Sequence, residues 1–361
     1  MRFGEALEEE RFVNVIRMAY EQGVRTFMTA DAYGAGAADE MLGRALEGFD
    51  RDSYCLVGSV GHDFYEGQRL GARGFPRFTH PELRTARDYP GYLKMAVEKS
   101  LERLKTDRLD LLMLHNPDYT GYTSDSIWSG LDRLKEEGLT HRLGVAPGPA
   151  NGFTLDVIQC FERFGPLIDW AMIILNPLEP WPGSLCFPAA IKHGVKVITR
   201  VVDHGGLFHG DVLPGHAFPD GDHRVYRPSG WVESGCEKIE QMKPLAEKYG
   251  VSALQLACLW NLSFEPVESV IPTFIQETGG SAKEIEEKIR DMASLPDVEL
   301  APEDAEAITQ IGNNKGCMNL KGANVGFEGE YEADRWALNP DLMSVGERWG
   351  ISPEEDLVCS H

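Results

Sequence analysis

The stretch Gly23-Val-Arg-Thr-Phe-Met-Thr-Ala-Asp-Ala-Tyr-Gly34, which runs into Asp39-Glu-Met-Leu-Gly43, decides the fold class of this chain. Residues 24–28 form a short run between turn signals, and such a run predicts a buried strand. An amphipathic stretch at residues 8–22 precedes this strand, and residues 39–46 follow it as a second predicted helix. The stretch therefore predicts one strand in an alternating series of helices and strands.

The alternation continues over most of the chain, which is the pattern of parallel strands connected by helices. Further strands are predicted at residues 54–58, 109–114, 143–146, 168–175, 195–202 and 267–271, and further helices at residues 91–104, 253–262 and 282–292. Seven strand candidates with intervening helices predict an α/β fold, a (β/α)8 TIM barrel. One strand is missing from the series, so either the start of the chain is truncated or residues 1–4 are the tail of a first strand. A barrel without that strand would leave an unpaired edge.

The chain has 361 residues, enough for one large barrel or two average domains. The barrel is predicted over residues 1–314. Residues 315–361 lie past it, and Trp336, Pro340 and Trp349 predict a tail that packs on the barrel.

Composition excludes several classes of function. The 35 basic and 57 acidic residues give a formal charge of −22, which argues against nucleic-acid binding because phosphate contacts need clustered Lys and Arg. The seven cysteines form no Cys-x-x-Cys pair, a pattern typical of reduced thiols in a cytoplasm. No apolar run of spanning length and no secretory leader is found. We therefore expect a cytoplasmic protein that acts on a small molecule away from membranes; the oligomeric state stays open.

The opening stretch resembles the signature of the aldo-keto reductases, Gly-x-x-x-Phe-Asp-Thr-Ala-Asp-x-Tyr-Gly. The resemblance covers residues 5–311 and implies the aldo-keto reductase type of barrel. It places Tyr33 at the proton-donating tyrosine of the family's catalytic tetrad and His115 at the tetrad histidine. Four more segments carry it: Asp110-Leu-Leu-Met-Leu-His-Asn-Pro-Asp118, Leu143-Gly-Val-Ala-Pro147, Gly205-Gly-Leu-Phe-His-Gly210 and Val270-Ile-Pro-Thr273.

The chain departs from the family at the remaining tetrad positions. Met28 stands at the tetrad aspartate and Ser59 at the tetrad lysine, so neither the charge that lowers the tyrosine pKa nor its orienting carboxylate is present. The family holds the nicotinamide carboxamide with Ser, Asn and Gln. The counterparts here are Ala146, Pro147 and Met172, which lack the required donors and acceptors.

The resemblance implies NADP or NAD as the cofactor, whereas these departures predict that the ordinary nicotinamide site is altered or lost. The segment that resembles the family's phosphate loop carries Glu277, a carboxylate that an anion would avoid. Backbone amides at Gly280 and Ser281, before the next predicted helix, could still bind phosphate, with Lys283 beside them. Arg200 stands where relatives line the nicotinamide; it could bind a carboxylate or phosphate, or form a salt bridge inside the barrel mouth.

The catalytic candidates follow the predicted strands, because barrel enzymes place their chemistry at the carboxyl ends of strands. They are the retained pair Tyr33 and His115 and the pair Asp203 and His204, which follows the strand at residues 195–202. His209 near that pair suggests a metal, but no helical His-x-x-x-His holds it, so no metal site is predicted.

Further polar and aromatic residues are predicted to line a substrate site at the same mouth. Asp31 could instead cap a turn, and His62 could be a solvated residue of the insertion at residues 61–89. The candidates are Asp31, His62, Asp118, Asn176, Glu179 and Trp181.

Three functions remain open from the sequence. The first is a divergent NAD(P)H-dependent oxidoreductase that acts on a carbonyl or hydroxyl carbon of a small sugar-like substrate with Tyr33 and His115. The second is a cofactor-free or metal-assisted lyase, dehydratase or isomerase on the same barrel. The third is a non-catalytic binding protein.

Overall fold

The computed structural model describes residues 3–69, 74–148, 153–315 and 338–357. Its sheet has seven parallel strands in sequence order, each bonded to the next along the chain. The strands are β1 (Thr26–Met28), β2 (Cys55–Val60), β3 (Leu111–His115), β4 (Leu143–Ala146), β5 (Trp170–Ile174), β6 (Lys196–Arg200) and β7 (Val267–Ile271). Sequential parallel order requires a crossover between each pair of strands, as the alternating pattern predicted.

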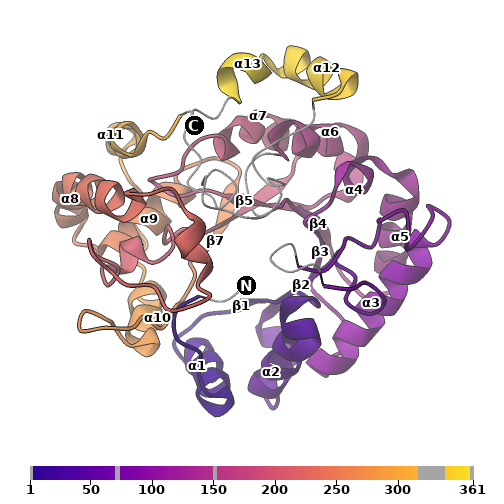
Figure 1. Cartoon of the computed structure of the whole chain (residues 1–361), viewed down its shortest axis with the longest axis horizontal. Helices are drawn as coiled ribbons and strands as arrows, with labels where there is room; N and C mark the ends of the chain where they lie inside the picture. Colours follow the sequence, from indigo (N-terminus) through magenta and orange to yellow (C-terminus); the bar gives the residue numbers. More distant parts are fainter. Residues whose placement is uncertain (1–2, 70–73, 149–152, 316–337, 358–361) are drawn as a thin grey trace.

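The helices form a ring around the curled sheet, as Figure 1 shows. Apolar side chains of the helices pack against those of the strands in one core, while α12 packs on α6 and α13 has no buried residue. The helices are α1 (Glu9–Glu21), α2 (Ala37–Leu46), α3 (Tyr89–Leu104), α4 (Tyr119–Thr123), α5 (Asp125–Glu136), α6 (Thr154–Phe164), α7 (Phe187–His193), α8 (Trp231–Tyr249), α9 (Ala253–Leu262), α10 (Ile285–Ala293), α11 (Pro302–Gly312), α12 (Pro340–Trp349) and α13 (Pro353–Asp356). No helix among the described residues is both long and apolar enough to span a membrane.

The predicted barrel fold is confirmed. Of the two alternatives for the missing strand, a strand tail at residues 1–4 is not found in its described part, residues 3 and 4. Residues 3 and 4 lie outside any strand, so β1 and β7 are the edges of the sheet that the structure describes. The start of the chain bonds to the loop after β7 instead, because Glu5 N donates to Gln276 O at 2.8 Å.

A small apolar cluster fills the inside of the barrel, separate from the outer core. Because side chains alternate between the two faces of a strand, every second residue points inward. The members are Val57, Leu111, Met113, Ala146, Met172 and Ile198, with Met28 packed against them. We call this cluster the apolar plug. It lies below the polar side chains at the carboxyl ends of the strands, which we call the mouth of the barrel.

The described part of the tail contacts the barrel through α12 and α13. Arg348 donates to both carboxylate oxygens of Glu162 on α6, at 3.0 and 2.5 Å. The Trp181 indole donates to Asp356 O at 2.6 Å. Trp336 and most of residues 315–338 lie outside the described residues, so the domain boundary at residue 314 stays a prediction.

Candidate active site at the carboxyl ends of the strands

Tyr33 and His115 meet at the mouth of the barrel. The backbone after β1 continues beside β2, where Asp31 N donates to Ser59 O at 3.1 Å, and this carries Tyr33 over the strand ends. His115 is the last residue of β3. The two rings lie 5.6 Å apart between centroids in a T-shaped arrangement. The structure therefore brings together the pair that the sequence analysis named first.

His115 is a neutral group in this setting. Burial lowers its pKa well below the usual value, and the nearby His62, Arg200 and Arg77 act in the same direction. Its Nδ1 atom is buried without a hydrogen-bond partner. A neutral imidazole with a free ring nitrogen can donate or accept one hydrogen bond to a substrate oxygen.

Tyr33 is 52% exposed, although protein surrounds it on several sides of the mouth. Desolvation raises the pKa of its phenol, and the Arg200 charge acts against that rise. Arg200, the last residue of β6, donates from Nη2 to Pro147 O and Gly148 O at 3.1 and 2.6 Å. A guanidinium from the opposite side of the sheet thus contributes positive charge near the tyrosine, while Ser59 contributes none.

His62 is held in the mouth and is not a solvated residue of the insertion. Its Nδ1 lies 2.8 Å from Phe75 O and its Nε2 lies 3.1 Å from the Asn116 side-chain nitrogen. A carbonyl can only accept and an amide NH2 can only donate, so Nδ1 carries the proton and Nε2 accepts. The His62 ring stands 5.4 Å from that of His115, between centroids.

A second polar group consists of Glu179, His204 and Arg227. His204 Nε2 lies 3.3 Å from Arg227 Nη1, so Nε2 is the acceptor, and Nδ1 lies 3.9 Å from Glu179 Oε2. Burial lowers the pKa of His204 well below its usual value and raises that of Glu179. His204 Nδ1 and Glu179 Oε1 are buried without hydrogen-bond partners.

Three predicted site residues are engaged by the backbone around them. Asp203 accepts from Thr273 N at 2.7 Å and Gly206 N at 2.8 Å, which joins the loops after β6 and β7. Asp118 accepts from Gly121 N at the start of α4. Asn176 accepts from Leu178 N and donates to Val201 O. These contacts give all three a structural role in shaping loops of the mouth.

Asp31 and Trp181 are both buried. Neither carboxylate oxygen of Asp31 has a hydrogen-bond partner; burial first, and then the Asp39 charge, raise its pKa well above the usual value. Trp181 is tied to the tail through its indole, as described above.

The candidate phosphate-binding residues Gly280, Ser281 and Lys283 do not lead directly into a helix. The predicted helix start at residue 282 is wrong, because α10 begins at Ile285. Lys283 is exposed, and its Nζ donates to His209 O at 2.7 Å. The amides at Gly280 and Ser281 thus lack the helix N-terminus that was expected to support anion binding.

The carboxamide positions do not fit a nicotinamide. Ala146 and Met172 belong to the apolar plug inside the barrel, and Met28 packs against it. Pro147 offers only its carbonyl, which accepts from Arg200. These side chains supply neither the donor nor the acceptor that an amide requires. Among the described residues, no three His, Cys, Asp or Glu side chains gather as a metal site.

The sequence analysis missed several cations and amides of the mouth. Arg77 donates from Nε to Asn116 O at 2.5 Å and belongs to the insertion before α3. Arg227 comes from the long loop before α8 and stacks 4.6 Å above the Trp231 ring. Both lie far from any strand end in sequence, so only the folded loops bring them to the mouth.

The model of the aldo/keto reductase family matches residues 1–312, and the chain belongs to this family. A probable aldo-keto reductase of Glycine max is 23% identical over 75% of this chain and 72% of its own length. The aldo-keto reductase YhdN of Bacillus subtilis (strain 168) is 24% identical over 71% of this chain and 72% of its own length.

Solved structures of the same family share the fold. The glycerol dehydrogenase AKR11B4 of Gluconobacter oxydans has a TM-score of 0.66 at 22% identity, over 86% of this chain and 87% of its own. An aldo-keto reductase of Klebsiella pneumoniae, in complex with NADP and acetate, has a TM-score of 0.58 at 19% identity, over 85% and 87% of the two chains.

Proposed function

We propose that this chain is an enzyme that transfers a proton to or from the oxygen of a carbonyl or hydroxyl group in a small, sugar-like substrate. Tyr33 is the acid–base group, and neutral His115 holds the same oxygen. The observation that carries the proposal is their T-shaped contact at the barrel mouth, beside a buried His115 Nδ1 that has no hydrogen-bond partner. Membership of a family of oxidoreductases supports carbonyl chemistry as the class of reaction.

Arg200 takes the electrostatic part of the missing tetrad lysine in this proposal. Its positive charge acts to lower the Tyr33 pKa, and a cation beside a phenol favours the phenolate that remains after proton donation. Within the described chain only its Nη2 donates hydrogen bonds, so other donors remain for a substrate carboxylate or phosphate. We therefore expect the substrate to carry an anionic group.

NAD(P)H would supply a hydride if it bound; the Klebsiella relative was solved in complex with NADP and acetate. The carboxamide positions of this chain do not fit that cofactor, so no step of the proposal passes through it. The apolar replacements at Met28, Ala146 and Met172 favour a second candidate: cofactor-free elimination or isomerisation by the same Tyr33 and His115.

The test is a panel of small hydroxy-aldehydes, hydroxy-ketones and hydroxy-acids in D2O, with and without NADPH, followed by NMR. Reduction that requires NADPH identifies an oxidoreductase. Deuterium beside the carbonyl, or loss of water, without nicotinamide identifies the second candidate. Either activity must fall in Tyr33→Phe and survive in Tyr119→Phe, a control at a tyrosine outside the proposed pair. Substrate binding without any conversion would contradict the proposal and leave a binding protein.

A further inference from the structure

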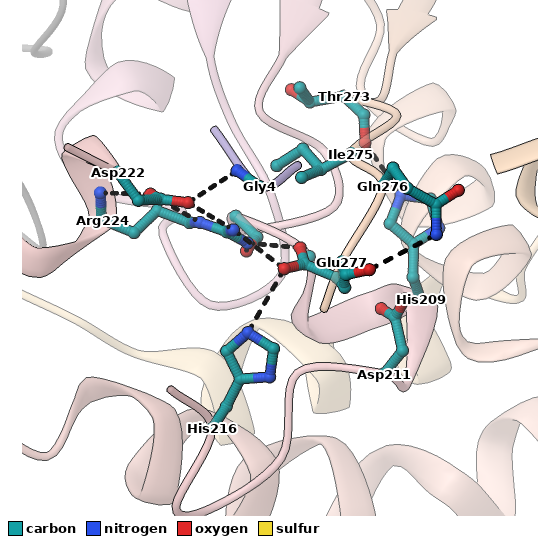
Figure 2. Close-up of polar contacts among 12 residues, drawn as sticks. Gly4, His209, Asp211, His216, Asp222, Arg224, Thr273, Ile275, Gln276 and Glu277 are labelled. Atoms are coloured by element: carbon teal, nitrogen blue, oxygen red, sulfur yellow. Dashed lines mark hydrogen bonds and ion pairs between the residues drawn. The ribbon is translucent and has the colours of Figure 1, made fainter. Parts of the chain in front are cut away.

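Glu277, in the loop after β7, forms a buried ion cluster with Asp222 and Arg224 from the loop before α8 (Figure 2). His216 lies beside them, and we call this set the Glu277 cluster. Arg224 and Glu277 are each 1% exposed, and Asp222 is fully buried. The resemblance assigns this loop to the phosphates of a dinucleotide.

Arg224 has no donor left for an external anion. Nη1 donates to Glu277 Oε1 at 2.5 Å and to Gly205 O at 2.9 Å. Nη2 donates to Glu277 Oε2 at 2.9 Å and to Asp222 Oδ2 at 2.7 Å, and Nε donates to Asp222 Oδ1 at 3.1 Å. A guanidinium carries five N–H groups, and here all five have acceptors within the chain.

Several cationic and backbone donors near this loop are also engaged within the chain. Thr273 N donates to Asp203, and Ile285 N, at the start of α10, donates to Gln276 Oε1. Lys283 Nζ donates to His209 O, and Lys288 Nζ donates to Ile275 O at 2.6 Å and lies 2.5 Å from Asp211. A phosphate that used these donors would have to break the bonds that they make within the chain.

The charge of the cluster also opposes a phosphate. Two carboxylates and one guanidinium leave one net negative charge when His216 is neutral. Glu286 and Glu287 add carboxylates in the first turn of α10, where an anion-binding helix would offer free N–H groups. A dinucleotide would bring further negative charge against this set at close range.

The same cluster anchors the start of the chain. Gly4 N donates to Asp222 Oδ2 at 2.7 Å, as Figure 2 shows. Gly4 has a φ of +56°, and a Cβ there would lie 2.3 Å from Gln276 O, so the backbone is packed directly on the loop. The contact joins residues 4–5, the loop before α8 and the loop after β7.

We infer that the Glu277 carboxylate occupies the position that a dinucleotide phosphate would take in this loop. The loop is then an internal clasp, meaning that it binds other segments of the chain, and it does not bind a dinucleotide. The buried Arg224 guanidinium donates two hydrogen bonds to the Glu277 carboxylate, as it would to a bound phosphate. The inference concerns a different part of the barrel from Tyr33 and His115, and either can fail alone.

The first experiment titrates the full chain with NADPH and with 2′,5′-ADP, followed by nicotinamide fluorescence and calorimetry. We expect no binding of either at millimolar concentration. Micromolar binding of either ligand would overturn the inference, while leaving the role of Tyr33 to its own assay.

The second experiment compares Glu277→Gln with Glu268→Gln, a matched control whose carboxylate forms an exposed pair with Lys196 at 2.7 Å. Removal of the internal anion leaves Arg224 with a surplus of positive charge relative to the parent. We expect the affinity for 2′,5′-ADP to rise roughly tenfold or more in Glu277→Gln and to stay unchanged in the control. An unchanged affinity in a folded Glu277→Gln variant would contradict the inference. If that variant does not fold, the titration of the parent chain decides alone.

Discussion

The Tyr33–His115 mouth and the Glu277 cluster are both polar, yet they differ in how their polar atoms are satisfied. In the mouth, His115 Nδ1 lacks a partner, as do Glu179 Oε1 and His204 Nδ1 behind it. In the Glu277 cluster every N–H of Arg224 has an acceptor, and the unbonded His216 Nε2 lies 3.3 Å from Glu277 Oε2. Buried groups without partners are costly and suggest a place that a ligand completes, whereas a guanidinium whose N–H groups are all used has none left for a ligand. Polar residues alone therefore do not define a site; unmet hydrogen-bonding capacity does.

The largest effect expected is on catalysis. Tyr33→Phe should lower kcat/KM by roughly 10²–10⁴-fold because a positioned acid–base group is removed, while its half-exposed side chain adds little to stability. Steady-state rates and urea unfolding of the same preparation check both statements. Unchanged rates would remove Tyr33 from the proposed chemistry.

Breaking the Glu277 cluster should act on stability instead. Arg224→Met should lower the free energy of unfolding by about 3–5 kcal/mol, because Glu277 and Asp222 would remain buried without their cation. Urea unfolding measures the loss, and adding Glu277→Gln and Asp222→Asn should restore part of it. If the free energy of unfolding fell no more than on removal of an exposed ion pair, the cluster would not be holding these segments of the chain together.

Asp156, a buried carboxyl group outside both regions, allows a prediction of how the stability of the fold depends on pH. Burial raises the pKa of Asp156, on α6, to about 7 from a usual value of 3.8. Between these values the folded protein keeps the proton that the unfolded chain has lost, so this group's contribution to stability falls as pH rises and levels off above about 7.

The asparagine side chain in Asp156→Asn does not titrate, so this variant should not show that fall in stability as the pH rises. Relative to the parent, the variant should gain roughly 2–3 kcal/mol between about pH 5 and about pH 8. Urea unfolding at both pH values, with the exposed Asp107→Asn as control, measures the difference. An equal difference at the two pH values would show that Asp156 is ionised throughout.

The smallest effect is expected at the surface pair between α12 and α6. Arg348 forms two hydrogen bonds to Glu162 but is half exposed, so Arg348→Gln should cost only about 0.2–1 kcal/mol. A much larger loss in urea unfolding would show that the tail supports the barrel more than these contacts indicate.

The sequence predicted the barrel because strand and helix periodicities are local properties. The strand at 267–271 and the helix at 253–262 were predicted with the bounds found for β7 and α9. The start of α10 was placed three residues early, at 282. Glu284 is the N-cap of α10, and Ile285 N bonds to the Gln276 side chain, a contact across the loop that local sequence cannot show.

In the candidate site, too, the sequence predicted some features and only the tertiary structure showed others. The motif around Tyr33 and the end of the strand at His115 named a pair that the structure brings into ring contact. Asp203 and His204 are adjacent in sequence, but Asp203 bonds to backbone N–H groups while His204 faces Glu179 and Arg227. Their separation depends on loop conformation, since His204 adopts a left-handed φ of 48°.

The sequence by itself determined the family, the barrel, and the replacement of polar tetrad and carboxamide residues by Met28, Ser59, Ala146 and Met172, because these depend on residue identity and short-range pattern. Only the tertiary structure decided which charges meet: Arg200 beside Tyr33, and Arg224 around Glu277. Arg224 and Glu277 are 53 residues apart in the chain. Coulomb energy depends on distance and on burial, and folding, rather than sequence separation, sets both.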